Sequence, residues 1–309
     1  MRLAFAGTPA AALPTLDALL KSRHDVAAVI SRPDARAGRG QLLATSPVTR
    51  RAAEEGIEVL RPVRPGDPDF LERLATIGPD CCPVVAYGAL LPQSALGIPP
   101  HGWVNLHFSI LPAWRGAAPV QHAILHGDDV TGATTFRIVK ELDAGPVFGV
   151  LTEPIRSFDT AGQLLDRLAA AGADLMVATL DGIESGELEA REQSQHGVSL
   201  APKVTPADAR VDWRGPAMAI DRLVRACTPE PGAWTELDGL RLKLWPVRLA
   251  SADTASVAPG EVRALRDLVL VGTATVPVML GDVQPHGKRR MPAADWARGA
   301  RLGGHAVLR

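Results

Sequence analysis

The chain is poor in the residues from which disulfide scaffolds are built. Only three of its 309 residues are cysteine, and two of them, Cys81 and Cys82, are adjacent. A disulfide framework is therefore excluded, and we expect a reducing compartment, the cytoplasm. No apolar run approaches the roughly 18 residues of a membrane-spanning helix, so an integral membrane protein is not expected. The short apolar start is broken at Gly7, which favours a first buried strand over a signal peptide.

Sequence motifs for common cofactors are also missing. The turn Gly7-Thr8-Pro9 holds one glycine where a dinucleotide fold places G-x-G-x-x-G, and its proline removes an amide donor. There is no Walker sequence, and no histidine or cysteine cluster has zinc-ligand spacing. We therefore expect neither a dinucleotide cofactor nor a metal. The adjacent cysteines lack a C-x-x-C pattern and are interpreted as buried small hydrophobes.

Length and periodicity predict two domains, the first of them α/β. The 309 residues amount to roughly two domains of about 150 residues. Strand-like segments at 2–6, 26–30, 58–60, 81–87 and 103–108 alternate with helical segments at 10–20, 49–55 and 70–77. This rhythm predicts an open, mostly parallel α/β sheet.

The second half of the chain has a different pattern. Segments 134–139 and 147–155 predict a hairpin, and Thr160 with Gln163 has the form of a capping box that opens a helix. A polar stretch at 187–197 lacks periodicity and is interpreted as a linker. After a helix at 217–226, short strand-like runs at 241–249, 260–265, 268–272 and 276–280 predict a small barrel or sandwich. We therefore divide the chain into an α/β domain at 1–188, a linker at 189–206 and a β domain at 207–309.

The near-neutral total charge conceals two parts of opposite sign. The whole chain has 33 Lys/Arg and 34 Asp/Glu, a net charge of −1. Residues 207–309 carry 15 basic and 11 acidic residues, whereas residues 1–206 carry 18 and 23. Lys288, Arg289 and Arg290 form the densest basic cluster. A basic β domain suits a nucleic-acid partner, and a solvated basic face is the alternative.

The strand at 103–108 carries two polar side chains on one face. Because side chains alternate along a strand, Asn105 and His107 share a face just before the carboxyl end, where open α/β sheets bind ligands. An amide and an imidazole can both donate to a developing oxyanion, as acyl transfer requires. The alternative is a pair of core polar residues that bond to neighbouring loops.

Two further features suit chemistry or binding. Asp143 lies in the turn between the two hairpin strands, where it could cap its own backbone or meet the end of the Asn105 strand. There it could fix the protonation of the imidazole or accept a proton from an amine. Arg36 and Arg39 lie in a glycine-rich loop that suits phosphate contacts, with a solvated surface loop as the alternative.

These residues belong to a longer series of motifs. The series consists of Ala6-Gly7-Thr8-Pro9, Ala37-Gly38-Arg39-Gly40, Ala86-Tyr87-Gly88, the run Ser109, Ile110, Leu111, Pro112, then Trp114-Arg115-Gly116, Leu142-Asp143, Asp212-Trp213 and Gly287-Lys288. The order of these motifs, over nearly the whole chain, resembles that in the folate-dependent formyltransferases, and among them in the family that acts on methionyl-tRNA. The block from Asn105 to Gln121 resembles folate-dependent formyltransferases in general. The arginine loop and the basic C-terminal domain resemble the tRNA-acting members.

The resemblance implies a Rossmann-like formyltransferase domain followed by a small OB-type β-barrel that binds tRNA. The donor would be 10-formyltetrahydrofolate, and the acceptor the α-amine of methionyl initiator tRNA, giving formylmethionyl-tRNA for translation initiation. No metal, membrane or obligate protein partner is implied. The implied catalytic residues are Asn105, His107 and Asp143; the folate contacts are Ser109, Ile110, Leu111, Pro112, Tyr87 and Leu90; and the tRNA contacts are Arg36, Arg39, Lys203, Lys288, Arg289 and Arg290.

Three departures from the family pattern and several alternatives remain. Ala10, Ala11 and Ala12 replace an aromatic residue, Ile110 replaces a leucine, and the arginine loop lacks its frequent lysines. A formyltransferase that acts on an amino-sugar nucleotide is the main alternative, because some carry a C-terminal β domain. A purine-pathway formyltransferase should end after the α/β domain, and a formyltetrahydrofolate hydrolase would not need a basic appendage. A silent RNA-binding module is the alternative of a different class.

Overall fold

The computed structural model describes residues 1–37, 42–300, 302 and 306–309. The chain forms two compact units. Unit 1 comprises Met1–Pro119, Val130–Pro154 and Leu165–Ala201, and unit 2 comprises Val120–Asp129, Ile155–Leu164 and Pro202–Arg309. None of the helices in the described ranges is both long and apolar enough to cross a membrane.

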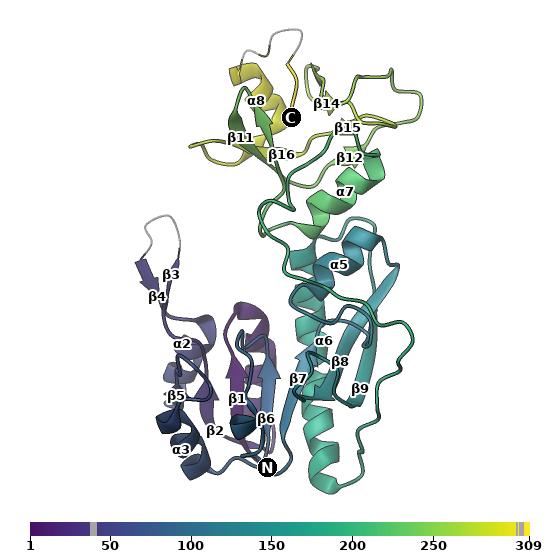
Figure 1. Ribbon diagram of the computed structural model, residues 1–309. Coiled ribbons are helices and arrows are strands. Elements are labelled where there is room, and N and C mark those ends of the chain that lie inside the picture. Colours follow the sequence, from purple (N-terminus) through teal and green to yellow (C-terminus); the bar gives the residue numbers. More distant parts are fainter. Residues whose placement is uncertain (38–41, 301, 303–305) are drawn as a thin grey trace. The chain divides into compact units, whose positions relative to one another are not determined.

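Unit 1 is built on a seven-stranded sheet (Figure 1). Its strands are β1 (Arg2–Gly7), β2 (Asp25–Ile30), β5 (Glu58–Leu60), β6 (Cys82–Val85), β7 (Trp103–His107), β8 (Val130–Arg137) and β9 (Val147–Pro154). Their order is β5-β2-β1-β6-β7-β8-β9; the first five strands are parallel, and β8 and β9 are antiparallel to their neighbours. The predicted mostly parallel α/β sheet and the predicted hairpin are both confirmed.

Helices connect the parallel strands of this sheet. The short helix η1 (Ala10–Ala12) leads into α1 (Leu13–Lys21), and α2 (Pro47–Glu54), α3 (Pro68–Ile77) and α4 (Gln93–Leu96) follow. Phe70 and Leu74 of α3 and Ala95 of α4 share one buried cluster with Trp103 of β7 and Ala4 of β1. Burial of this apolar face against the sheet is the main force that holds such layers together.

The long helix α6 (Ala161–Ser185) begins at the predicted capping box. The Gln163 N–H donates to the Thr160 hydroxyl at 3.3 Å, and the Thr160 N–H donates to Gln163 Oε1 at 3.1 Å. This reciprocal pair satisfies two of the amide groups that a helix start leaves without a partner. The helix α5 (Pro119–His126) lies between β7 and β8 in the sequence.

The main segment of unit 2 is a small β domain with two helices (Figure 1). The helices are α7 (Ala217–Ala226), at the predicted position, and α8 (Ala293–Ala300); the strands are β10 (Trp234–Leu237), β11 (Leu240–Leu244), β12 (Arg248–Leu249), β13 (Val262–Ala264), β14 (Val269–Val271), β15 (Val278–Met279), β16 (Asp282–Pro285) and β17 (Met291–Pro292). The strands form two four-stranded antiparallel sheets around one apolar core. The sequence patterns missed β10, β16, β17 and α8.

Two segments interpreted as irregular have defined pairing. Within the predicted arginine loop, β3 (Ala35–Ala37) pairs with β4 (Leu42–Ala44) as a hairpin, in which Arg36 lies opposite Leu43. Residues 38–41 between them lie outside the described residues. In the stretch interpreted as a linker, Val147 and Arg191 exchange backbone hydrogen bonds of 2.7 and 2.8 Å. The part of the stretch up to Ala201 therefore belongs to unit 1.

Candidate active site

The site begins with the alternation of side chains along β7. Asn105 is half-buried and His107 is buried, with 6% of its surface exposed. Trp103, two residues earlier on the same face, donates its indole N–H to the Ala95 carbonyl of α4 and fixes the strand beneath the helix. Leu106, on the opposite face, packs against α6 at Gly172. The predicted placement of Asn105 and His107 on one face follows from this packing.

The segment after β7 is held by hydrogen bonds to Thr134 of β8. The Thr134 hydroxyl donates to the Ser109 carbonyl at 2.7 Å and accepts from the Leu111 N–H at 3.1 Å. The Ser109 hydroxyl donates to the Ala113 carbonyl at 2.6 Å. These bonds fix residues 109–113 and thereby the carbonyl of Trp114 that follows them.

The His107 ring has two different polar neighbours. Its Nε2 lies 2.9 Å from the Trp114 carbonyl oxygen, and because a carbonyl only accepts, Nε2 carries the hydrogen. Its Nδ1 faces Asp143 Oδ2 at 3.8 Å. Burial lowers the pKa of His107 below 6.5, against the opposing effects of the Asp143 charge and the Trp114 carbonyl. The imidazole is therefore neutral near pH 7, with the lone pair of Nδ1 directed toward a carboxylate.

Asp143 lies in the connection between β8 and β9, and the backbone around it fixes its position. Its Oδ2 accepts the Gly116 N–H at 2.8 Å, and its φ is +49°, a left-handed value that only few non-glycine residues adopt. A Cβ at Gly145 would lie 1.8 Å from the Arg137 carbonyl, and one at Gly116 would lie 2.6 Å from the Ala201 carbonyl. Both glycines are therefore required for the backbone to approach this closely.

The predicted folate contacts lie at the carboxyl edge of the sheet. β6 and β7 are parallel neighbours, so the residues that follow them, including Tyr87 and Ser109, leave the sheet at the same edge. Tyr87 is buried, its carbonyl accepts the Thr8 hydroxyl at 2.8 Å, and burial raises the pKa of its phenol. Leu90, in contrast, is 81% exposed. Ile110 and Pro112 are half-buried and Leu111 is buried.

The predicted tRNA contacts belong to both units. Arg36 lies in β3, and Arg39 lies outside the described residues. Lys203, Lys288 and Arg289 are exposed in unit 2. Arg290 is also exposed, but its Nε donates to Asp282 Oδ2 at 2.7 Å, and its guanidinium lies 4.8 Å from the ring centre of Trp245. Part of the basic cluster is therefore engaged within the protein.

Sequence reasoning missed three groups that complete the site. The Trp114 carbonyl and the Gly116 N–H are backbone atoms, and no residue type predicts their roles, although both residues belong to a motif of the series above. Gln193 comes from the stretch interpreted as a linker, yet only 8% of its surface is exposed. Its side chain bonds to both the Asp143 connection and Arg115.

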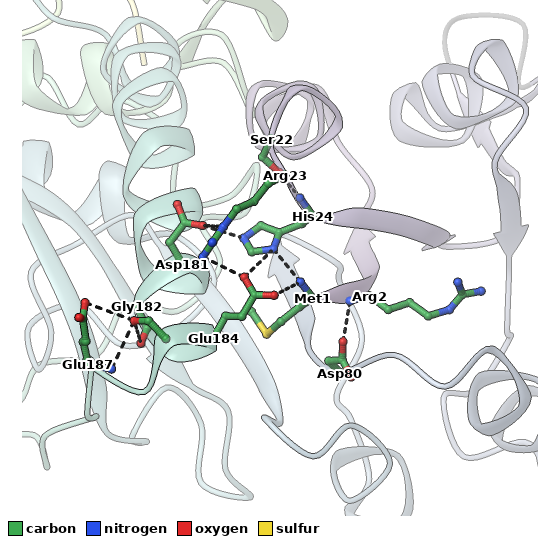
Figure 2. Close-up of polar contacts among 11 residues, drawn as sticks. Met1, Arg2, Ser22, Arg23, His24, Asp80, Asp181, Gly182, Glu184 and Glu187 are labelled. Carbon is green, nitrogen blue, oxygen red and sulfur yellow. Dashed lines mark hydrogen bonds and ion pairs between the residues drawn. The ribbon is translucent and has the colours of Figure 1, made fainter.

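A second polar cluster, away from these residues, joins His24 to α6 (Figure 2). His24, Asp181 and Glu184 bring possible metal-ligand atoms within 4.8 Å of one another. However, both carboxylates already bond to cations: Arg23 to Asp181 and Glu184, and the Met1 ammonium to Glu184. A metal ion would have to displace or repel these charges. We interpret the cluster as a tie between the start of β1, the start of β2 and the end of α6.

Comparison with known proteins adds the family. The family described as "Formyl transferase" matches residues 1–180, and that described as "Formyl transferase, C-terminal domain" matches residues 203–301. A protein of Thermobifida fusca named methionyl-tRNA formyltransferase is 66% identical over 98% of this chain and 97% of its own length.

Two solved structures share the fold at low identity. HypX from Aquifex aeolicus, in complex with tetrahydrofolic acid, superposes on 96% of this chain with a TM-score of 0.68 and 21% identity. This chain spans 46% of the length of HypX. The N-formyltransferase from Helicobacter canadensis, in complex with folinic acid and dTDP-3-aminofucose, superposes on 92% of this chain and 99% of its own, with a TM-score of 0.66 and 18% identity.

Proposed function

This chain belongs to the formyl transferase family, and we propose that it transfers the formyl group of 10-formyltetrahydrofolate to the α-amine of methionyl initiator tRNA. The product is formylmethionyl-tRNA, which serves translation initiation, and the place of action is the cytoplasm. The observation that carries this proposal is the 66% identity, over nearly the full length of both chains, to a protein named methionyl-tRNA formyltransferase. The grouping of Asn105, His107 and Asp143 in unit 1 supports the same chemistry.

We propose direct transfer between the two substrates. The neutral amine attacks the formyl carbon, a C–N bond forms, and the carbonyl electron pair moves to oxygen. The Asn105 amide donates to this oxyanion, an interaction worth about 2.7–4 kcal/mol for one well-placed donor. The proton that the amine loses passes to His107 Nδ1, whose lone pair faces Asp143. The bond to N10 of the folate then breaks, N10 takes up the proton that His107 received from the amine, and the carbonyl of the new formamide is restored.

The geometry supports a role for each protein group in this series of steps. Because Nε2–H of His107 donates to the Trp114 carbonyl, Nδ1 is the atom that can accept the proton. The imidazolium formed there is stabilised by the charge of Asp143, while the Asn105 amide remains the donor to the oxyanion. Asp143 is itself fixed by the Gly116 N–H.

The residues at the carboxyl edge fit a folate of mixed polarity. Leu90 offers an exposed apolar side chain beside Gly88, whose φ of +84° turns the chain sharply after β6. Ser109 has its hydroxyl bonded within the loop, so we propose that residues 109–112 offer mainly backbone groups and the half-buried Ile110. Tyr87 is buried, and its carbonyl accepts the Thr8 hydroxyl.

We propose that residues 1–188 carry the transfer reaction and that residues 207–309 hold the tRNA, with 189–206 between them. Lys203, Lys288 and Arg289 are exposed and available to phosphates, and Arg36 of β3 stays a proposed contact from the sequence. An amino-sugar nucleotide as acceptor is the second candidate. The N-formyltransferase from Helicobacter canadensis, whose structure contains dTDP-3-aminofucose, is only 18% identical to this chain. This similarity shows a common fold and does not favour the sugar nucleotide as acceptor.

A formyl-transfer assay decides between the two acceptors. The full chain with 10-formyltetrahydrofolate should formylate methionyl initiator tRNA and leave a dTDP-amino sugar unmodified. Transfer to the sugar nucleotide with none to tRNA would refute the proposal.

A further inference from the structure

Residues 187–197 contain one deeply buried polar side chain, that of Gln193. Its neighbours Glu192, Ser194 and Gln195 are exposed, whereas only 8% of the surface of Gln193 is. A buried amide is costly unless its donors and acceptor are paired, so its partners indicate why it is there.

The Gln193 amide is satisfied from two separate segments. Its Nε2 donates to the carbonyl oxygens of Asp143 and Gly145, both at 2.8 Å. Its Oε1 accepts from Arg115, at 3.1 Å from Nε and 2.6 Å from Nη2. Both amide hydrogens and both lone pairs of the oxygen are therefore used.

The two segments that Gln193 joins are those that hold the imidazole and the carboxylate. On one side, Arg115 stands between Trp114, whose carbonyl accepts from His107, and Gly116, whose N–H binds Asp143. On the other side, Gln193 bonds directly to the backbone of Asp143. The side chain thus closes a ring of hydrogen bonds around the 3.8 Å approach of His107 to Asp143.

Backbone conformation explains why such a ring is needed. Asp143 has φ of +49° and Trp114 has φ of +60°, both in the left-handed region that disfavours residues with a Cβ. Conformations of this kind persist where surrounding bonds hold them. The two Gln193 donors fix the peptide that follows Asp143 and the one that follows Gly145.

We propose that Gln193 is a positioning residue for formyl transfer, which keeps Asp143 in place against His107. The expected change in the kcat of formyl transfer rests on the proposed function. The stretch that carries Gln193 is attached to unit 1 by backbone bonds as well, between Val147 and Arg191 and between Arg115 and Ser199. Replacement of the side chain should therefore leave the stretch in place and the unit folded.

Two substitutions of similar shape test the proposal in the full chain. Gln193→Met removes all four hydrogen bonds, and Gln193→Glu keeps an acceptor for Arg115 but sets a carboxylate oxygen against two carbonyls. The matched controls are Gln195→Met and Gln195→Glu, at an exposed glutamine two residues away. We expect kcat to fall by up to about 10²-fold in the Gln193 variants, which is the effect of misplacing a catalytic group by roughly 1 Å. KM for both substrates should be unchanged. The control variants should match the unmodified chain.

A readout that needs no substrate separates this inference from the proposed function. The His107 imidazole is titrated by NMR in each variant. Because the Asp143 charge raises the pKa of His107, an Asp143 that is no longer held in place should leave this pKa lower than in the unmodified chain. If the unmodified chain formylates no tRNA but the Gln193 variants shift this titration, the proposed function fails and the positioning role stands.

Three outcomes would overturn the positioning role. One is wild-type kcat together with an unchanged His107 titration in both Gln193 variants. Another is an equal effect in the Gln195 controls. The third is loss of the cooperative thermal transition in both Gln193 variants, which would make the residue a structural element of unit 1.

Discussion

His107 Nδ1 faces Asp143 Oδ2 across 3.8 Å, while the opposite nitrogen of the same ring donates to the Trp114 carbonyl at 2.9 Å. This pairing assigns the two nitrogens different tasks. Nε2 orients the ring, and Nδ1 is the atom at which a proton can be taken up beside a negative charge. Because the ring is buried and the pKa of His107 is lowered, the imidazole is neutral near pH 7, as the proposed uptake of a proton requires.

Removal of the Asp143 charge should slow proton transfer. Asp143→Asn keeps the size of the side chain and an oxygen for the Gly116 N–H but no longer stabilises an imidazolium at Nδ1. Since positioned acid–base groups contribute about 10²–10⁴-fold, we expect kcat to fall within that range with KM unchanged. The pKa of His107 should fall further below 6.5, because the charge that raises it is gone. Glu141→Gln, an exposed carboxylate two residues away, is the control.

Gly145 should not tolerate a side chain. A Cβ there would lie 1.8 Å from the Arg137 carbonyl, so Gly145→Ala must displace the connection that carries Asp143. We expect a loss of about 1–3 kcal/mol in the free energy of unfolding, measured in urea, together with a lower kcat. Gly299→Ala is the control, because a Cβ at that position in α8 meets nothing within 4 Å. A Gly145→Ala variant as stable and active as the control would contradict the geometry of the turn.

The cluster in Figure 2 predicts how stability depends on pH. Burial, and then the Met1 ammonium, lowers the pKa of His24 below 6.5 in the folded chain. The unfolded chain therefore binds more protons as the pH falls through 6.5, and the free energy of unfolding should decrease there. His24→Asn keeps an acceptor for the ammonium and should reduce this decrease, measured by urea titrations above and below pH 6.5. Identical pH dependence in both proteins would show that His24 does not titrate as described.

The basic cluster predicts a salt-dependent contact with tRNA. Lys288 and Arg289 are exposed, whereas Arg290 is paired with Asp282. Lys288→Ala and Arg289→Ala should each weaken tRNA binding and reduce the slope of log Kd against log salt by about one. Arg73→Ala, which removes an exposed arginine of unit 1, should change neither quantity. Unaltered slopes in the unit 2 variants would place the tRNA contact elsewhere.

Local pattern was sufficient for several features that one element determines. The helix at 217–226, the capping box at Thr160 and the shared face of Asn105 and His107 all follow from neighbouring residues, and the structure confirms them. The approach of Asp143 to His107 depends instead on a left-handed backbone at a non-glycine residue, which no propensity predicts.

Long-range pairing and short strands explain two features that the sequence did not reveal. The stretch at 187–197 has no periodicity of its own, because Arg191 pairs with Val147 and Gln193 bonds to the backbone at 143–145. The arginine loop contains a hairpin whose three-residue strands are too short to show alternation. The first is a contact between distant segments, which only the folded chain brings together, whereas the hairpin is local and was missed because its strands are short.

The most direct test of the account is the single-turnover rate of formyl transfer to methionyl initiator tRNA by an Asn105→Ala variant. The Asn105 amide is the proposed donor to the oxyanion, and loss of one such donor costs about 10²–10³-fold in rate. We therefore predict a decrease of that size with unchanged affinity for folate and tRNA and an unchanged thermal transition. A rate near that of the unmodified chain would contradict the assignment of this site as the place of transfer.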